Sequence, residues 1–255
     1  DTQIDMGTEQ QASDEIKKIA LEFGAGLVGI TNYDNRWEYS RKFSDMSATS
    51  RPAEIPDTLN NVIVIAQPMD YELVRTVPSA LSGSATGLGY SHDALTVLSL
   101  TQYIRNLGYE AIGSMNDTSL AIPYAIKAGL GEYGRHGLLI TPKYGPRIRL
   151  GKVYTNMPLS HDRPIRFGVK EFCEICRRCT KGCPVKAIPD GPPSKDTHNQ
   201  SNILGVKKWS VDGEKCFGFW AAQNTDCSIC IRVCPYNKDY SRWLHKLGLR
   251  LAGTR

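Results

Sequence analysis

Cysteine is absent from the first 172 residues of this 255-residue chain. A small secreted fold held together by disulfides would normally carry cysteines along its whole length, so the sequence does not indicate that class of protein. All eight cysteines fall between Cys173 and Cys234. Any chemistry that needs thiols is therefore confined to one C-terminal segment.

The sequence also lacks a long hydrophobic run and a strong excess of one charge. No stretch approaches the roughly 18 apolar residues that a membrane-spanning helix needs, and the N-terminal DTQIDMGTEQQ shows no basic-then-apolar signal pattern. The formal net charge of +5 is mild, and basic residues are interspersed with acidic ones along the chain. This permits nucleic-acid binding but does not indicate it. With 41% hydrophobic and 22% charged residues, the chain has the composition of a globular protein.

Hydrophobic periodicity predicts helices over residues 11–23, 92–107 and 119–129. It predicts strands over residues 24–31, 60–70 and 147–159, and a strand followed by a Pro/Gly turn within residues 136–145. These elements do not follow a regular strand-helix-strand order. We therefore predict an α+β domain over residues 1–165 and a loop-rich, cysteine-bearing domain over residues 166–255. The second domain contains a polar, Pro/Gly/Ser-rich connection at residues 189–201.

Two cysteine runs share a distinctive spacing. EFCEICRRCTKGCPVKAI has the pattern C-x2-C-x2-C-x3-C-P and contains Cys173, Cys176, Cys179 and Cys183. DCSICIRVCPYN has the pattern C-x2-C-x3-C-P, with one more cysteine upstream, and the set is Cys216, Cys227, Cys230 and Cys234. The first spacing is typical of bacterial ferredoxins with two clusters, in which the fourth cysteine binds the other cluster.

By analogy, we predict one 4Fe-4S cluster on Cys173, Cys176, Cys179 and Cys234, and a second on Cys183, Cys216, Cys227 and Cys230. Closely spaced thiolates on one turning loop can reach three corners of a cubane, and the fourth ligand must come from elsewhere. The alternative is a pair of structural zinc sites, since zinc also binds thiolates. Zinc sites usually show separated C-x2-C pairs without C-x3-C-P endings, so we favour iron-sulfur clusters.

AGLGEYGRHG contains a literal G-x-G-x-x-G at Gly129, Gly131 and Gly134. A dinucleotide site needs a strand before these glycines and a helix after them. Here a helical pattern precedes them and the apolar run LLIT follows, so we interpret the glycines, with Gly137, as positions of close backbone approach.

The segment AGLGEYGRHGLLITPKYGPRIRLG, followed by FCEICRRCTKGCPVKAI, CFGFW and DCSICIRVCPYNK, resembles the corrinoid-dependent reductive dehalogenases and the related epoxyqueuosine reductases. The resemblance covers about residues 60 to 240. It implies a nitroreductase-like α+β domain that binds a cobalamin-type corrinoid without a histidine below the cobalt, beside a ferredoxin-like module with two 4Fe-4S clusters. The usual histidine motif, D-x-H-x-x-G, is matched only in part around His198, because Ser201 stands in place of the glycine. We interpret His198 as a solvated histidine.

The resemblance also implies the active-site residues. Tyr90 is expected as the proton donor, Arg149 as the cation that stabilises the tyrosinate, and Asn116 as a nearby hydrogen-bonding group, with Arg147 a competitor for the role of Arg149. The expected corrinoid contacts are Thr86, Gly129, Gly131, Gly134, Gly137, Tyr144 and Trp220.

The function implied is reductive dehalogenation, in which electrons pass through the clusters, reduce cobalt to Co(I) and replace the halogen of an organohalide, such as a chlorinated ethene, by hydrogen. One alternative is an epoxyqueuosine reductase acting on tRNA. Another is a two-cluster electron carrier without a substrate, although the long cysteine-free part of the chain argues against it.

We expect a small organohalide substrate, an electron donor or small membrane-anchor subunit as partner, no nucleic acid, and possible homodimerisation. If respiratory family members are the right comparison, the protein works at the outer face of the cytoplasmic membrane; otherwise it is cytoplasmic. Family members are generally longer, with a twin-arginine signal, more N-terminal sequence and a further C-terminal segment. This chain is therefore expected to be a trimmed, natural minimal or designed version.

Overall fold

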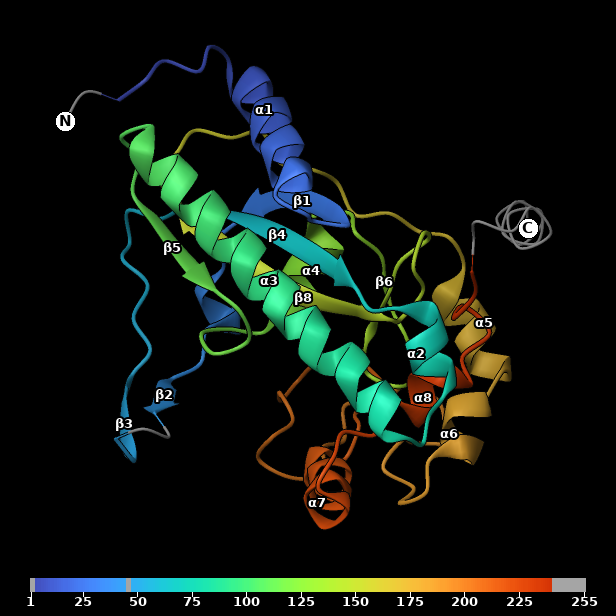
Figure 1. The fold of residues 1–255 in the computed structure, drawn as a ribbon. Coiled ribbons are helices and arrows are strands. Elements are labelled where there is room, and N and C mark those ends of the chain that lie inside the picture. The colour runs from blue at the N-terminus through green and yellow to red at the C-terminus, as the bar shows by residue number, and fades with distance from the viewer. Residues whose placement is uncertain (1–2, 45–46, 240–255) are drawn as a thin grey trace. The chain divides into compact units, whose positions relative to one another are not determined.

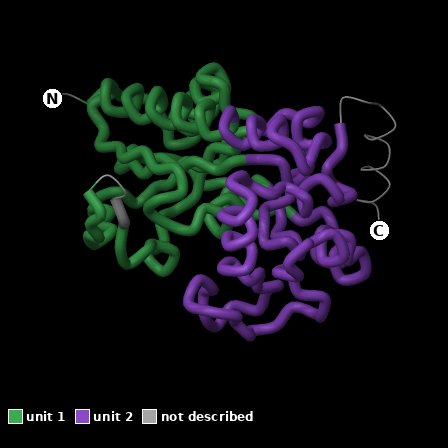
Figure 2. Tube along the Cα trace, turned by 60° about the horizontal axis from the view of Figure 1, so that its bottom comes forward, with its two compact units in different colours: residues 1–67, 89–130, 149–165 green, residues 68–88, 131–148, 166–255 purple. Residues whose placement is uncertain are grey.

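The structure is a computed structural model that describes residues 3–44 and 47–239. The chain forms two compact units, which Figure 2 colours separately. Unit 1 comprises residues 1–67, 89–130 and 149–165, and unit 2 comprises residues 68–88, 131–148 and 166–255.

Unit 1 is built on a four-stranded sheet with the strand order β1-β4-β8-β5. The strands are β1 (Leu27–Asn32), β4 (Asn61–Pro68), β8 (Ile148–Thr155) and β5 (Ala111–Ser114). Strands β1 and β4 pair antiparallel, from Leu27 opposite Ala66 to Asn32 opposite Asn61, and β5 pairs antiparallel with β8. The β-branched run of β4, NVIVIAQP, is buried at every position except its terminal proline, which places it in the interior of the sheet.

Two helices cover one face of this sheet (Figure 1). Helix α1 (Glu9–Glu22) has Thr8 as its N-cap, which forms a capping box with Gln11. Helix α3 (Ala80–Asn106) contributes its residues from 89 onward to unit 1. Their apolar side chains and those of the sheet form one core, which includes Ile16, Ala20, Ile30, Ile63, Ile65, Val97, Leu100, Ile104 and Val153. Burial of each large aliphatic side chain contributes about 1.5–3 kcal/mol.

Glycines on two strands allow α3 to approach the sheet closely. A Cβ atom on Gly113 of β5 would lie 2.6 Å from the Thr101 hydroxyl oxygen. A Cβ atom on Gly151 of β8 would lie 2.5 Å from both Asp93 Oδ1 and Val97 Cγ2. Since real Cβ atoms do not make such short contacts, a larger residue at either position would push α3 away from the sheet.

Helix α4 (Ala121–Lys127) packs against β1 from the opposite side, where a Cβ atom on Gly29 would lie 2.2 Å from the Ala128 carbonyl oxygen. Tyr154 stacks edge-to-face with both Tyr33 and Tyr124 near this helix. Unit 1 also contains the 3-10 helix η1 (Asn35–Trp37) and an antiparallel hairpin of β2 (Arg41–Ser44) and β3 (Thr49–Pro52).

Unit 2 consists of short elements joined by loops. Its helices are α2 (Tyr71–Arg75), α5 (Val169–Ile175), α6 (Arg178–Gly182), α7 (Gly213–Gln223) and α8 (Ile229–Arg232), together with residues 80–88 of α3. Strands β6 (Glu132–Tyr133) and β7 (Leu139–Ile140) form a small hairpin. Cysteines take part in three of its small apolar clusters, so the thiols themselves form much of the interior.

Several predicted element boundaries were wrong. The helix expected to begin at residue 92 begins at Ala80, because its glycines lower helix propensity without breaking the helix. The strand expected before the Pro/Gly turn within residues 136–145 is limited to β7, since residues 134–138 form the turn of a hairpin. The periodicity of the sequence did not reveal β5, the β2–β3 hairpin, or the short helices of unit 2, because elements of four to seven residues carry too few side chains to show a period.

Candidate active site and metal centres

Three residues predicted to be catalytic lie together in unit 1. Tyr90 is on α3, Arg149 is the second residue of β8, and Asn116 lies in the loop after β5. Asn116 Nδ2 donates a hydrogen bond to the Tyr90 phenol oxygen over 3.2 Å, and Arg149 Nη1 donates to the same oxygen over 3.4 Å. The guanidinium carbon of Arg149 is 4.6 Å from the centre of the Tyr90 ring. The fold thus brings both nitrogen donors to one phenol oxygen.

Two further titratable side chains adjoin this group. Asp93, one helical turn after Tyr90, is 1% exposed, and its Oδ1 has no hydrogen-bond partner among the described residues. Burial raises the pKa of Asp93 to about 7, although the positive charges of Lys152 and Arg149 oppose this change. The Lys152 ammonium donates to two backbone carbonyls between β5 and α4, and its burial lowers its pKa to about 8. Asp93 therefore interacts with the positive charges of both Arg149 and Lys152.

Arg147, the competing arginine, belongs to unit 2 and has its own set of partners. Its Nη1 donates to the Met69 carbonyl over 2.9 Å, and its Nη2 donates to the Lys238 carbonyl over 3.2 Å. Its guanidinium carbon lies 5.1 Å from the centre of the Tyr71 ring. Burial lowers the pKa of Arg147. Its hydrogen bonds connect two backbone segments of unit 2.

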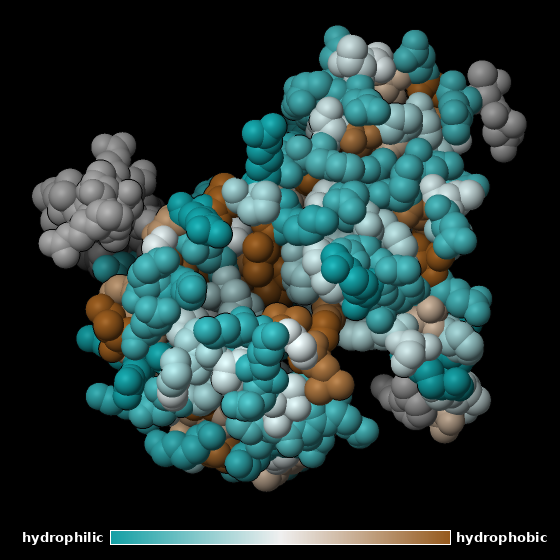
Figure 3. Space-filling view, turned by 180° about the vertical axis from the view of Figure 1, so that it is seen from behind, coloured by the Kyte–Doolittle hydropathy of each residue, from teal (hydrophilic) through white to brown (hydrophobic). Residues whose placement is uncertain are grey.

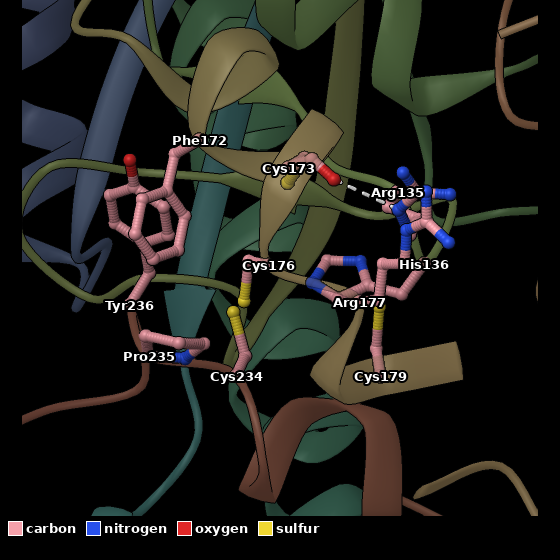
Figure 4. A pocket seen from close by; sticks show the side chains of 10 residues that line it. All are labelled: Arg135, His136, Phe172, Cys173, Cys176, Arg177, Cys179, Cys234, Pro235 and Tyr236. Atoms are coloured by element: carbon pink, nitrogen blue, oxygen red, sulfur yellow. Dashed lines mark hydrogen bonds between the residues drawn. The ribbon is translucent and has the colours of Figure 1, made fainter. Parts of the chain in front are cut away.

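One pocket of unit 2 is lined by four cysteines, which are Cys173, Cys176, Cys179 and Cys234 (Figure 4). Cys173 lies on α5, Cys179 lies on α6, and Cys234 follows α8. Burial raises the pKa of the Cys179 thiol to about 11 and that of Cys234 to about 12. These thiols are free of disulfides, so all four sulfur atoms can act as ligands.

The remaining cysteines form a second group in unit 2. Cys183, Cys216 and Cys230 share one apolar cluster, to which Cys179 of the first set also belongs. After burial itself, the pKa of the Cys216 thiol is raised by the negative charges of Cys183, Cys227 and Asp212. Cys227 in turn interacts with Cys183. The four cysteines of the first predicted set thus line one pocket, and those of the second set interact with one another, so the assignment of each set to one cluster stays a prediction. Within the described residues, no three His, Cys, Asp or Glu side chains converge closely enough to hold a single metal ion.

Two residues of the β6–β7 hairpin also line the first cysteine pocket. Arg135 is 2% exposed, and its guanidinium lies 4.8 Å from the centre of the Trp209 ring. It donates hydrogen bonds to the backbone carbonyls of Cys173, Glu174, Pro189 and Gly191. His136 is 5% exposed, and burial lowers its pKa to about 4.

The G-x-G-x-x-G run follows α4 and precedes β7, which confirms that it does not connect a strand to a helix. Gly129 and Gly137 have positive φ angles, at 74° and 79°. A Cβ atom on Gly131 would lie 2.2 Å from the Ile140 carbonyl oxygen, and one on Gly134 would lie 2.7 Å from Ile140 Cδ1. Packing or backbone conformation within the protein thus explains why each of these positions is a glycine. Contact of these glycines with a corrinoid stays a prediction.

The other predicted corrinoid contacts lie in unit 2. Thr86 donates a hydrogen bond to Asp226, and the Tyr144 backbone amide donates to the Thr141 hydroxyl. Trp220 lies on α7, and its buried indole Nε1 has no hydrogen-bond partner among the described residues. His198 is exposed.

Sequence reasoning missed Asp93, Lys152, Arg135 and His136. Asp93 lies three residues after Tyr90, a spacing that places both on one side of a helix, so this signal was available. Arg135 and His136 lie between Gly134 and Gly137, and this position in a tight turn was the only feature of the sequence that pointed to them. Their burial depends on packing against α5 and was not readable from the sequence.

Comparisons with known proteins show what this chain is similar to. Residues 47–159 match a family model described as "Reductive dehalogenase subunit", and residues 172–237 match one described as "4Fe-4S double cluster binding domain". The second match confirms the predicted iron-sulfur character of the cysteine segment and disfavours structural zinc.

Two curated relatives are tetrachloroethene reductive dehalogenases. The one from Desulfitobacterium hafniense is 37% identical over 93% of this chain and 50% of the relative. The one from Sulfurospirillum multivorans is 36% identical over 90% of this chain and 51% of the relative. The chain therefore spans about half the length of these relatives.

Among solved structures, "Catabolic reductive dehalogenase NpRdhA" matches with a TM-score of 0.85 and 26% identity, covering 98% of this chain and 35% of that chain. This match confirms the predicted α+β fold with a two-cluster ferredoxin-like module. Epoxyqueuosine reductase from Streptococcus thermophilus matches with a TM-score of 0.56 and 19% identity, covering 88% of this chain and 65% of that chain, which shows a shared fold.

None of the helices in the described part of the chain is long and apolar enough to cross a membrane. The face drawn in Figure 3 is largely hydrophilic, with hydrophobic side chains in smaller groups. Over the half of a full-length relative that it spans, the chain is similar to the tetrachloroethene reductive dehalogenases.

Proposed function

We propose that this chain is part of a reductive dehalogenase that replaces a carbon-bound halogen by hydrogen in a small organohalide, such as a chlorinated ethene. The reaction consumes a proton and a pair of electrons and releases halide. The observation that carries the proposal is the Tyr90–Arg149–Asn116 group, found in the same chain as two sets of four cysteines.

The hydrogen bonds of Tyr90 suit a proton donor. A phenol oxygen has two lone pairs and one O–H group. Asn116 Nδ2 and Arg149 Nη1 both donate to this oxygen, so the lone pairs are occupied and the phenol proton is free to point toward substrate. After proton transfer, the guanidinium of Arg149 stabilises the tyrosinate, and Asn116 keeps the oxygen in place. We assign the catalytic role to Arg149 rather than to Arg147.

We assign the two cysteine sets to two 4Fe-4S clusters, which deliver electrons one at a time. Thiolates are the ligands that such clusters prefer, and the pocket of the first set is lined by these sulfur atoms and largely apolar surroundings. Burial raises the pKa of the Cys179 and Cys234 thiols when no metal is bound. Bound iron would hold both as thiolates, so cluster binding and folding of unit 2 are coupled.

We further propose that a corrinoid provides the cobalt at which the carbon–halogen bond is broken. Trp220 Nε1 is a buried donor without a partner among the described residues, and the amide-bearing periphery of a corrinoid offers acceptors for such a group. The residues that would hold it are those predicted from the sequence, Thr86, Gly129, Gly131, Gly134, Gly137, Tyr144 and Trp220.

The proposed partners follow from the same similarity to reductive dehalogenases. They are an electron donor or a small membrane-anchor subunit, and the proposed location is the outer face of the cytoplasmic membrane. Co-purification with a tagged anchor subunit from membranes, and its loss after a salt or detergent wash, would test both.

The experiment that tests the function is metal analysis and halide release with anaerobically prepared chain reconstituted with iron, sulfide and corrinoid. We expect about eight iron and one cobalt per chain, halide release from tetrachloroethene, and loss of release in Y90F with unchanged metal content. Iron without bound cobalt would instead indicate an electron carrier. Salt-dependent tRNA binding without halide release would indicate an epoxyqueuosine reductase.

A further inference from the structure

His136 lies in the turn of the β6–β7 hairpin and lines the same pocket as Cys173, Cys176, Cys179 and Cys234. Figure 4 shows its imidazole ring pointing from the hairpin toward this group of sulfur atoms. The side chain is only 5% exposed, so its polar atoms cannot rely on bulk water.

The hydrogen bonds of the ring define where its proton lies. The Leu138 backbone N–H donates to His136 Nδ1 over 3.2 Å, so Nδ1 is an acceptor and carries no proton. A neutral imidazole has its single proton on the other nitrogen. His136 Nε2 is therefore an N–H donor, and it is buried with no hydrogen-bond partner among the described residues.

A buried donor without an acceptor is unfavourable, and such a group in a folded protein indicates a partner that the protein atoms alone do not supply. The four cysteines that line this pocket are expected to bind a 4Fe-4S cluster, which is the partner that the protein atoms do not supply. The sulfides and thiolates of a 4Fe-4S cluster accept N–H hydrogen bonds and carry the negative charge of the cluster.

We infer that His136 donates a hydrogen bond from Nε2 to a sulfur atom of the cluster held by Cys173, Cys176, Cys179 and Cys234, and thereby raises the reduction potential of that cluster. Reduction adds negative charge, which is spread over the sulfur atoms, so a donor to sulfur stabilises the reduced form more than the oxidised form. His136 is thus a positioning and tuning residue rather than a ligand.

The hairpin holds the ring in a defined place. Gly134 N donates to the Leu138 carbonyl, Gly137 N donates to the Gly134 carbonyl, and Gly137 has a φ of 79°. A Cβ atom on Gly134 would lie 2.8 Å from His136 Cε1, so only glycine leaves room for the ring here. The neighbouring Arg135 anchors the turn through its bond to the Cys173 carbonyl.

Arg135 affects the same cluster differently. Its guanidinium donors bind backbone carbonyls, so it contributes positive charge and structure without a free donor aimed at sulfur. Removal of Arg135 would disturb the loop that carries Cys173. Removal of the His136 donor changes one hydrogen bond, and this difference makes His136 the better residue to vary.

The test is a redox titration of the reconstituted full chain, followed by electron paramagnetic resonance of each reduced cluster. In H136L, we expect the ratio of oxidised to reduced first cluster at a fixed potential to rise at least threefold, which corresponds to about 28 mV for one electron. The H136Q variant, which keeps an N–H donor at a similar reach, should recover part of the shift. The second cluster is an internal control, and its potential should not change in H136L. The variant H198Q, at an exposed histidine, is a matched control, and the potential of the first cluster should not change in it.

Pulsed paramagnetic resonance on protein made with histidine carrying the heavy nitrogen isotope gives a second readout. We expect coupling between a histidine nitrogen and the first reduced cluster in the unchanged protein. Absence of this coupling, or equal potentials in H136L and the unchanged protein at full iron content, would overturn the inference. If H136L fails to bind iron, the presence or absence of this coupling in the unchanged protein still tests whether His136 bonds to the cluster. Failure of the proposed function itself would appear separately, as missing iron or missing halide release in the unchanged protein.

Discussion

The guanidinium carbon of Arg149 lies 4.6 Å from the centre of the Tyr90 ring, while Nη1 of the same side chain reaches the phenol oxygen over 3.4 Å. One arginine from β8 thus contacts both the ring face and the oxygen of one tyrosine from α3. Because arginine keeps its charge at any relevant pH, this contact is present through the whole working range of the protein.

Removal of the phenol proton should abolish turnover. We predict that Y90F lowers kcat for halide release by about 10²–10⁴-fold, the usual contribution of a positioned proton donor. The phenylalanine ring keeps the packing, so iron and cobalt content should match the unchanged protein. Retention of full activity in Y90F with both metals present would exclude Tyr90 as the donor.

Arg147 and Arg149 should affect different properties. The R147M variant leaves the Met69 and Lys238 carbonyls without their donor, and we predict a loss of about 1–3 kcal/mol in free energy of unfolding. The R149M variant should lower kcat by about 10²-fold or more, since it removes charge stabilisation of the tyrosinate. Urea titration and steady-state kinetics on both variants separate the two roles. A larger kinetic effect in R147M would reverse our assignment.

Asp93 should make stability depend on pH. Its pKa is raised from the ordinary 3.8 to about 7, so the folded state binds the proton more tightly than the unfolded state. The contribution of Asp93 to the free energy of unfolding is therefore largest below about pH 4, and it declines as the pH rises toward 7. We predict that D93N removes this decline, so the urea midpoint of D93N rises relative to that of the unchanged protein between about pH 4 and pH 7. The exposed control D14N should keep the decline.

Gly151 should be intolerant of a methyl group. A Cβ atom there would lie 2.5 Å from Asp93 Oδ1, so we predict that G151A displaces α3 and destabilises the protein by about 1–3 kcal/mol. In α3, a Cβ atom on Gly87 would meet nothing within 4 Å. The matched control G87A should therefore stabilise the helix by about 0.5–1 kcal/mol. Thermal unfolding of both variants checks the pair, and equal effects would contradict the packing argument.

The grouping of cysteines predicts which cluster each variant loses. Cys234 lines the pocket of the first set, so C234S should lose the first cluster, whereas C183S should lose the second. Each variant should retain about four of about eight iron atoms. Iron analysis and the paramagnetic signal that remains identify the lost cluster. If C183S lost the signal that couples to His136, the grouping would be wrong.

Local sequence alone determined the cysteine spacing, the β-branched strand of residues 61–68 and the amphipathic helix of residues 9–22. These features depend on contacts within a few residues, and such contacts follow from side-chain type and chain geometry. The same kind of information indicated a ferredoxin-like segment and, through the family resemblance, Tyr90 and Arg149.

Only the tertiary structure decided that Asp93 lies buried beside Arg149 and that His136 points into the first cysteine pocket. Each of these depends on packing between segments far apart in the chain. A sequence specifies such packing collectively, through close approach at glycines such as Gly151 and burial of polar groups, and no single stretch of residues contains it.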